Sequence, residues 1–151
     1  MIAPTADIPP TDLGRTIQVE VPPVAGSIAI ARSVVRRTVI FRDDHAHSSF
    51  LLAVTEILAN AIDEHDRLGL GTAITATIES DDDGVAVVRI GDVGDGFDPT
   101  DRGSGVDEDG RPSDRGRGIA LAEAFVPGLT FESGPAGTVA SLPLAGMGIV
   151  R

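Results

Sequence analysis

The feature that most constrains the fold is an apolar segment in the first half of the chain. Ten of the thirteen residues from 50 to 62, FLLAVTEILANAI, are apolar. A helix that is apolar around most of its circumference has to be surrounded by core. We therefore expect a buried central helix from about Phe50 to Asp66, capped by Ser48 or Ser49.

The few polar residues of this helix are informative. Glu56 and Asn60 are four positions apart, so they lie one above the other on one helix face. Asn is a poor residue for a helix interior, because its amide competes for backbone hydrogen bonds. A carboxylate and an amide oxygen suit Mg²⁺, which prefers to share its shell with substrate phosphates. Two interpretations stay open: a ligand site at these residues, or a solvated stripe of Glu56, Asn60 and Glu64.

Length and composition limit the classes of protein to consider. The 151 residues suffice for one core, so we expect one domain over residues 15–151 after a loose, proline-rich tail at residues 1–14. A formal net charge of −11 without a basic patch argues against nucleic-acid binding. The lack of Cys excludes disulfides and thiol catalysis. With no signal-peptide pattern and no segment long enough to span a membrane, we expect a cytoplasmic protein.

The rest of the chain alternates between strand and helix patterns. Residues 72–80 and 85–91 flank an Asp-rich turn and predict a hairpin. Residues 98–118 contain almost no large apolar side chain and predict a long loop, which inside a compact domain is usually functional. Strands are further expected at 16–21, 129–132 and 138–142, and helices at 28–39 and 118–125.

A second motif follows the second strand of the hairpin. Asp92-Val-Gly94-Asp-Gly96 has two glycines, which permit unusual backbone torsions and a close approach by a ligand. The same pattern is also typical of a plain Asp-Gly turn at a strand end. A calcium loop of the EF-hand type is disfavoured, because its carboxylate spacing and closing Glu are missing.

A third motif, Arg115-Gly116-Arg117-Gly118, opens the helix predicted near residue 118. Free backbone N–H groups and the positive end of a helix favour an anion at this place. Both arginines offer bidentate phosphate contacts, although solvated surface charge is the alternative for each. The segment lacks the Gly-Lys-Ser/Thr of a Walker A loop and the complete Rossmann fingerprint.

The three histidines, His45, His47 and His65, do not match any metal-ligand spacing. We expect them to be scattered surface residues. The C-terminal residues 144–151 form a short apolar end to which the sequence assigns no function.

The order of these motifs from Thr16 to Leu144 resembles that of the GHKL (Bergerat-fold) ATPases. Glu56-x-x-x-Asn60 is similar to their N box and Asp92-x-Gly94-x-Gly96 to their G1 box. Gly116-x-Gly118 is similar to the G2 box at the end of an ATP lid, and Gly137-Thr138 to the final box. The GFDP after the second motif and the RGRGIAL of the third are most similar to the bacterial anti-sigma-factor serine kinases.

The resemblance implies roles for these residues. Asn60 would hold Mg²⁺ and Glu56 would be the general base. Asp92 would accept the adenine amino group, and Thr138 would support Asp92. The remaining members of the site would let the base and the phosphates approach the backbone: Gly94, Gly96, Arg115, Gly116, Arg117 and Gly118.

The resemblance also implies a fold and an activity. We expect an α/β two-layer sandwich with a mixed, mostly antiparallel sheet, about three helices on one face, and a long ATP lid. The activity would be ATP-dependent phosphorylation of a serine or threonine on an anti-sigma-factor antagonist of the STAS type, with a sigma factor as the second partner and a possible homodimer. The alternatives are a nucleotide-tuned interaction module with little turnover, and a stand-alone histidine-kinase-like ATPase domain, which is disfavoured because no phospho-accepting helix precedes it.

The sequence departs from the family pattern at two places. Many relatives have His four residues after the N-box Asn, whereas this chain has Glu64 there and His65 one residue later. The end of this helix is therefore expected to differ. The predicted lid is also rich in acidic residues, which weakens the expectation of tight binding to a triphosphate.

Overall fold

The computed structural model describes residues 15–80, 85–94 and 115–151, and within these ranges the fold is built on a five-stranded sheet. The strand order is β1-β3-β4-β6-β5, and each neighbouring pair is antiparallel. The strands are β1 (Arg15–Val21), β3 (Ile74–Ser80), β4 (Ala86–Asp92), β5 (Thr130–Gly134) and β6 (Gly137–Pro143).

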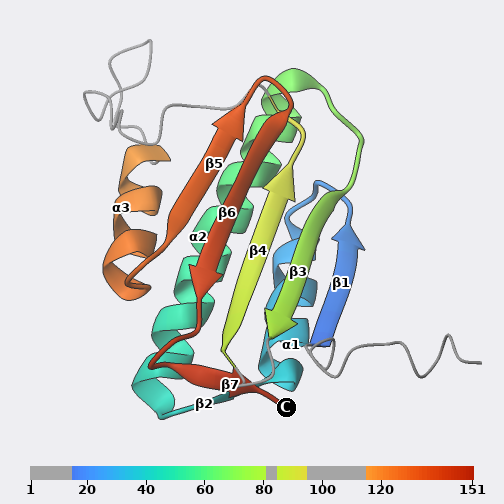
Figure 1. Ribbon diagram of the computed structural model, residues 1–151. Helices are drawn as coiled ribbons and strands as arrows, with labels where there is room; N and C mark the ends of the chain where they lie inside the picture. Colours follow the sequence, from blue (N-terminus) through green and yellow to red (C-terminus); the bar gives the residue numbers. More distant parts are fainter. Residues whose placement is uncertain (1–14, 81–84, 95–114) are drawn as a thin grey trace, which may run out of the picture.

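Three helices accompany the sheet, α1 (Gly26–Thr38), α2 (Asp44–Leu68) and α3 (Arg115–Phe125). Figure 1 shows α1 and α2 behind the sheet, with α3 beside α2 at the β5 edge. In the described part of the chain, helices cover one face of the sheet and none covers the other, which we call the open face. This arrangement confirms the predicted α/β class with a mostly antiparallel sheet and helices on one side.

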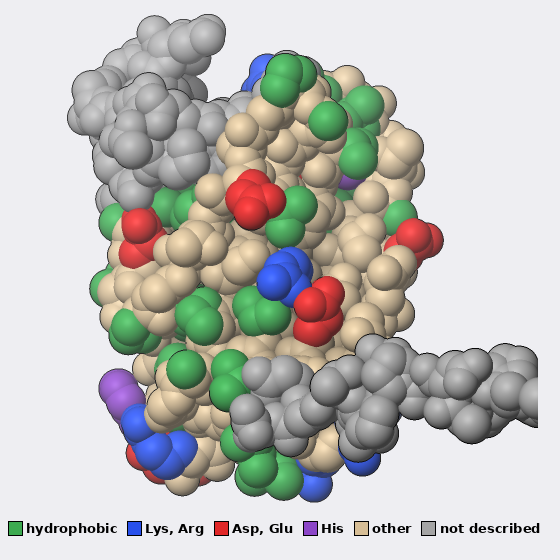
Figure 2. Space-filling view, viewed as in Figure 1, with side chains coloured by type: hydrophobic (Ala, Val, Ile, Leu, Met, Phe, Trp, Pro, Cys, Tyr) green, Lys and Arg blue, Asp and Glu red, His purple; other side chains and the backbone are tan. Residues whose placement is uncertain are grey.

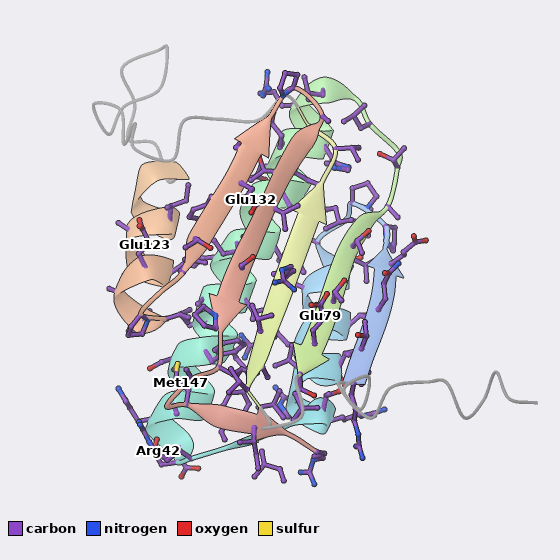
Figure 3. All side chains as sticks on the ribbon, in the orientation of Figure 1. Arg42, Glu79, Glu123, Glu132 and Met147 are labelled. Carbon is purple, nitrogen blue, oxygen red and sulfur yellow. The ribbon has the colours of Figure 1, made fainter. Side chains whose placement is uncertain are left out.

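The two faces of the sheet differ in composition, as the alternation along a strand requires. Ile74 and Ile78 of β3, with Val88 and Ile90 of β4, are buried toward the helices. On the open face, Arg89 forms a salt bridge with Glu79. Figure 3 shows Glu79 and Glu132 on this face, and Figure 2 shows charged side chains among hydrophobic ones over the sheet. The core therefore lies between the sheet and α1 and α2.

The central helix α2 is the element most enclosed by this core. Phe50, Leu51 and Leu58 are almost completely inaccessible to solvent. Burial of each such side chain contributes about 1.5–3 kcal/mol to folding. The prediction that this segment is surrounded by core is confirmed, with Leu52 as the exposed exception.

The start of α2 differs from the prediction. Asp43 is the cap, because its side chain accepts a hydrogen bond of 2.7 Å from the backbone N–H of Ala46. The helix therefore begins at Asp44, almost two turns before Phe50, and the caps predicted at Ser48 and Ser49 are wrong. Asp is as good a cap as Ser, and its negative charge also interacts favourably with the helix N-terminus. Asp43 is therefore a stronger cap than Ser48 or Ser49.

This cap makes stability depend on pH. The backbone N–H of Ala46, and then Arg42, hold the pKa of Asp43 below its ordinary value of 3.8. A lowered pKa in the folded state means that the charged form stabilises the fold above pH 3.8 and that this contribution is lost as the pH falls through the folded-state pKa. We expect wild type to have a higher melting temperature than Asp43→Asn at neutral pH and the difference to vanish in a titration well below pH 3.8. A difference that grows on acidification would contradict this role.

Two short strands were not predicted. β2 (Val39–Phe41) and β7 (Gly148–Val150) pair in antiparallel register, with Ile40 opposite Ile149. The helix predicted to reach residue 39 therefore ends at Thr38, and the apolar C-terminal end is part of the fold. Three-residue strands stabilise each other only when paired, so neither segment has a recognisable pattern alone.

Some predictions fall on residues that are not described. The tail at 1–14 and the part of the predicted loop from 98 to 114 lie outside the described residues, whereas residues 115–118 form the first turn of α3. In the described part of the chain, no helix combines the length and the apolar character needed to cross a membrane.

Candidate functional site

The polar face of α2 forms one wall of the candidate site. Glu56, Asn60 and Glu64 are all only partly exposed, and the Glu64 side chain retains 13% of its accessible surface. A fully solvated stripe, the alternative left open by the sequence, does not fit this degree of burial. Glu64 also forms a salt bridge of 2.6 Å with Arg67.

The second wall is the end of β4, where Asp92 is held by two backbone N–H groups. Its Oδ1 accepts hydrogen bonds from the N–H of Gly94 at 2.9 Å and from that of Thr138 at 3.3 Å. Both bonds engage the same carboxylate oxygen, which orients Oδ2 for a further donor. The carboxylate is therefore fixed in place before any ligand arrives.

Gly137 and Thr138, at the start of β6, bring a third segment against Asp92. Thr138 lies opposite Asp92 in the ladder between β4 and β6. Its backbone N–H contacts the carboxylate, while its hydroxyl lies 2.7 Å from the hydroxyl of Ser133. Gly137 has φ +131°, and a Cβ there would lie 2.0 Å from the carbonyl oxygen of Asp92. Only glycine permits this approach.

The first turn of α3 completes the site against the same polar face of α2. A Cβ on Gly118 would lie 2.7 Å from Oε2 of Glu56 and 3.9 Å from Nδ2 of Asn60. The backbone of α3 therefore lies directly against the two polar residues that the sequence singled out on α2. The N-terminus of α3, with its free N–H groups, is next to a carboxylate and an amide.

Gly94 lies between the end of β4 and the polar face of α2. It is buried, and a Cβ there would lie 2.5 Å from Cγ of Glu64 and 3.2 Å from Oδ1 of Asp92. Glu64 follows Asn60 by four residues, a rise of about 6 Å along the helix. One face of α2 therefore runs from the Asp92 end of the site to the Gly118 end.

The structure thus brings together six of the predicted site residues: Glu56, Asn60, Asp92, Gly94, Gly118 and Thr138. Gly96 lies outside the described residues. Arg115, Gly116 and Arg117 belong to the first turn of α3, but their side chains are not described. Among the described residues, no three His, Asp or Glu side chains are grouped as a metal site requires.

Sequence reasoning missed one residue next to this site. His65 was expected on the surface, but it is completely buried, so that expectation is wrong. Its ring contacts the backbone of Thr72 and of Val93, the residue that follows Asp92. The helical spacing from Ile57, Leu58 and Ala61 was the available signal, since His65 continues their apolar face.

Comparison with protein families identifies the domain type. The sequence model of the family described as histidine kinase-like ATPase domain matches residues 21–143, which is most of the chain. The chain belongs to the histidine kinase-like ATPase family. The match includes all four motifs, from the Glu56 segment to Thr138, and it implies that the domain binds ATP.

Among solved structures, this ATPase domain is similar to the crystal structure of the RsbU and RsbW domains of Rv1364c from Mycobacterium tuberculosis. The TM-score is 0.60 at 17% sequence identity, with 91% of this chain and 33% of that chain covered. This likeness supports the fold. A comparison with curated protein sequences finds no match.

The residues present fit a nucleotide. The carboxylate of Asp92 is oriented by two N–H donors and suits an exocyclic amino group. The glycine backbones at 94 and 118 lie directly against the side chains of Glu64 and Glu56, so the polar face of α2 is in contact with both ends of the site. The amide of Asn60 and the helix N-terminus beside it offer an oxygen for Mg²⁺ and donors for phosphate oxygens.

Proposed function

We propose that this chain is an ATP-dependent protein serine/threonine kinase of the anti-sigma-factor type. The observation that carries the proposal is the contact between the start of α3 and the polar face of α2. It places the Glu56 carboxylate and the Asn60 amide beside the N-terminus of a helix. A base, a metal ligand and anion donors are the groups that phosphoryl transfer requires.

At one end of the site, Asp92 would bind the adenine. Its Oδ1 is occupied by the N–H groups of Gly94 and Thr138, so Oδ2 would accept from the adenine amino group. The buried Gly94 would let the base lie against the backbone. The Asp92 end of the site would bind and orient ATP and would take no part in phosphoryl transfer.

At the other end, Glu56 and Asn60 would act on the γ-phosphoryl group. Mg²⁺ held by Asn60 would neutralise phosphate charge. Glu56 would accept the proton of the attacking hydroxyl while its oxygen bonds to phosphorus and the bond to ADP breaks. Arg115, Gly116, Arg117 and the N–H groups of the first turn of α3 would hold phosphate oxygens.

The partners we propose are a sigma factor and a STAS-type antagonist that carries the acceptor serine or threonine. The fold similarity to a protein with RsbU and RsbW domains supports this choice, as does the resemblance of the RGRGIAL segment. The use of ATP fits a cytoplasmic site of action. A homodimer is part of the same proposal.

A second candidate is a nucleotide-tuned interaction module with little turnover. The acidic residues between the second and third motifs favour it, because like charges there oppose the approach of a triphosphate. They are Asp98, Asp101, Asp107, Glu108, Asp109 and Asp114.

Calorimetric titration of ATP and ADP, with and without Mg²⁺, tests the proposal. We expect wild type to require Mg²⁺ for tight ATP binding and Asn60→Ala to weaken it by about 10- to 100-fold, because a metal ligand is lost. Asp66→Asn, at an exposed position of the same helix, is the control and should bind as wild type does. Absence of ATP binding in wild type would refute the kinase and leave an interaction module, whereas ATP binding without turnover would favour the second candidate.

A further inference from the structure

His65 is fully buried and connects three segments of the chain through its ring. It lies near the end of α2, and its Nδ1 is 3.1 Å from the carbonyl oxygen of Thr72. Its Nε2 is 3.2 Å from the backbone nitrogen of Val93, which donates to it. One ring therefore connects α2 to the loop before β3 and to the segment that leaves β4.

The two partners determine where the ring carries its proton. The Thr72 carbonyl can only accept, so Nδ1 must carry the hydrogen. The Val93 N–H can only donate, so Nε2 must offer a lone pair. The geometry requires a neutral ring protonated at Nδ1, because a second proton on Nε2 would face the N–H of Val93.

Among the described residues, the backbone of Val93 is held by this hydrogen bond and by the close approach of Gly137 to its Cα. The ladder between β4 and β6 ends one residue earlier, at the pair of Asp92 and Thr138. Val93 is 51% exposed, so the packing of its side chain does little to anchor it. Its hydrogen bond to His65 acts on the same stretch as the bond from the Gly94 N–H to Asp92, and the neighbouring Glu64 packs against Gly94.

We propose that His65 is a positioning residue for the nucleotide site. By accepting the N–H of Val93, it sets the path of the chain from Asp92 to Gly94 and thus the direction of the Asp92 carboxylate. This inference rests on the proposed function, since it assumes that Asp92 receives the base of the nucleotide. His65 touches no ligand and acts through the backbone of Val93.

Two variants of similar size separate the two hydrogen bonds of the ring. In His65→Gln, the side-chain amide reaches about as far as Nε2 and can still accept from Val93. In His65→Asn, it reaches only as far as Nδ1 and can still donate to Thr72. We expect His65→Asn to lose about tenfold in ATP and ADP affinity and His65→Gln to stay within about threefold of wild type.

Ser27→Ala is the matched control for a general loss of stability. Ser27 is also completely buried and donates a hydrogen bond of 2.6 Å to the carbonyl of Pro22, away from the site. Its loss should lower the melting temperature without changing nucleotide affinity. Measured phosphoryl-transfer kinetics of His65→Asn should show a raised KM for ATP and a kcat close to that of wild type.

A measurement on the wild-type protein makes the test independent of how well the variants fold. Long-range ¹H–¹⁵N NMR should show His65 protonated at Nδ1 and unprotonated at Nε2, and the Val93 amide resonance should shift when ATP binds. Protonation at Nε2, or equal losses of affinity in both variants, would overturn the role of His65. Failure of wild type to bind any nucleotide would instead overturn the proposed function and this role with it.

Discussion

Replacing Gly137 with Ala is expected to destabilise the domain by about 3 kcal/mol or more and to lower its melting temperature by roughly 10 °C. Gly137 has φ +131°, a conformation that residues with a side chain rarely adopt. The added Cβ would lie 2.0 Å from the carbonyl oxygen of Asp92 and 2.9 Å from Cα of Val93. Both contacts are with backbone, which cannot rotate away as a side chain can.

The same change should disturb the site. The clash would push β6 away from the end of β4, where the N–H of Thr138 reaches the carboxylate of Asp92. Gly137→Ala is therefore expected to lose nucleotide affinity as well as stability.

Thermal unfolding followed by circular dichroism gives the first readout and calorimetry the second. Gly134→Ala is the matched control, because Gly134 pairs with Gly137 in the same hairpin but has open space around it. We expect Gly134→Ala to unfold within a few degrees of wild type. If both variants were equally stable, the close approach of Gly137 to Asp92 would be wrong.

Replacing Glu56 with Gln is expected to slow phosphoryl transfer by about 10²- to 10⁴-fold, the usual contribution of a general base. Gln has the same shape but cannot take up the proton of the attacking hydroxyl. ATP affinity should change by less than about threefold, since Glu56 is not proposed to bind the nucleotide. Transfer from γ-labelled ATP to water or to an acceptor protein measures the effect.

The control for the loss of charge is Glu132→Gln, at an exposed position on the open face of the sheet. It should transfer phosphate at the rate of wild type. Unchanged transfer in Glu56→Gln would show that another group takes the proton.

Gly118→Ala displaces the same carboxylate without removing it. The new Cβ would lie 2.7 Å from Oε2 of Glu56, the far end of a flexible side chain, so Glu56 can turn aside while the backbone stays. Ala also favours a helix by about 1 kcal/mol relative to Gly. This variant should therefore keep the stability of wild type and lose transfer activity, a combination that a general folding defect would not produce.

Much of the fold was predictable because its signals are local. The alternating residues of β3 predict a strand with one buried face, and Ile74 and Ile78 are buried as expected. The apolar composition of the central helix α2 likewise predicts its burial. The fold class and the hairpin of β3 and β4 follow from such patterns together with the family resemblance.

The errors arise where one segment depends on a distant one. β2 and β7 are separated by more than a hundred residues and exist only as a pair, so neither has a pattern of its own. The cap at Asp43 competes with Ser48 and Ser49, and the packing of Phe41 against Phe50 and His47 accompanies the earlier start. Local propensity does not choose among three good capping residues.

By itself, the sequence determined which residue types are available to the site and which helix or strand carries each of them. Only the tertiary structure decided that the backbone of Gly118 lies against Glu56, that Thr138 supports Asp92 through its backbone N–H, and that the ring of His65 accepts from the N–H of Val93. The physical reason is that periodicity fixes the face on which a side chain lies. The close approach of two backbones, and the burial of a polar ring between them, depend on how separate elements pack.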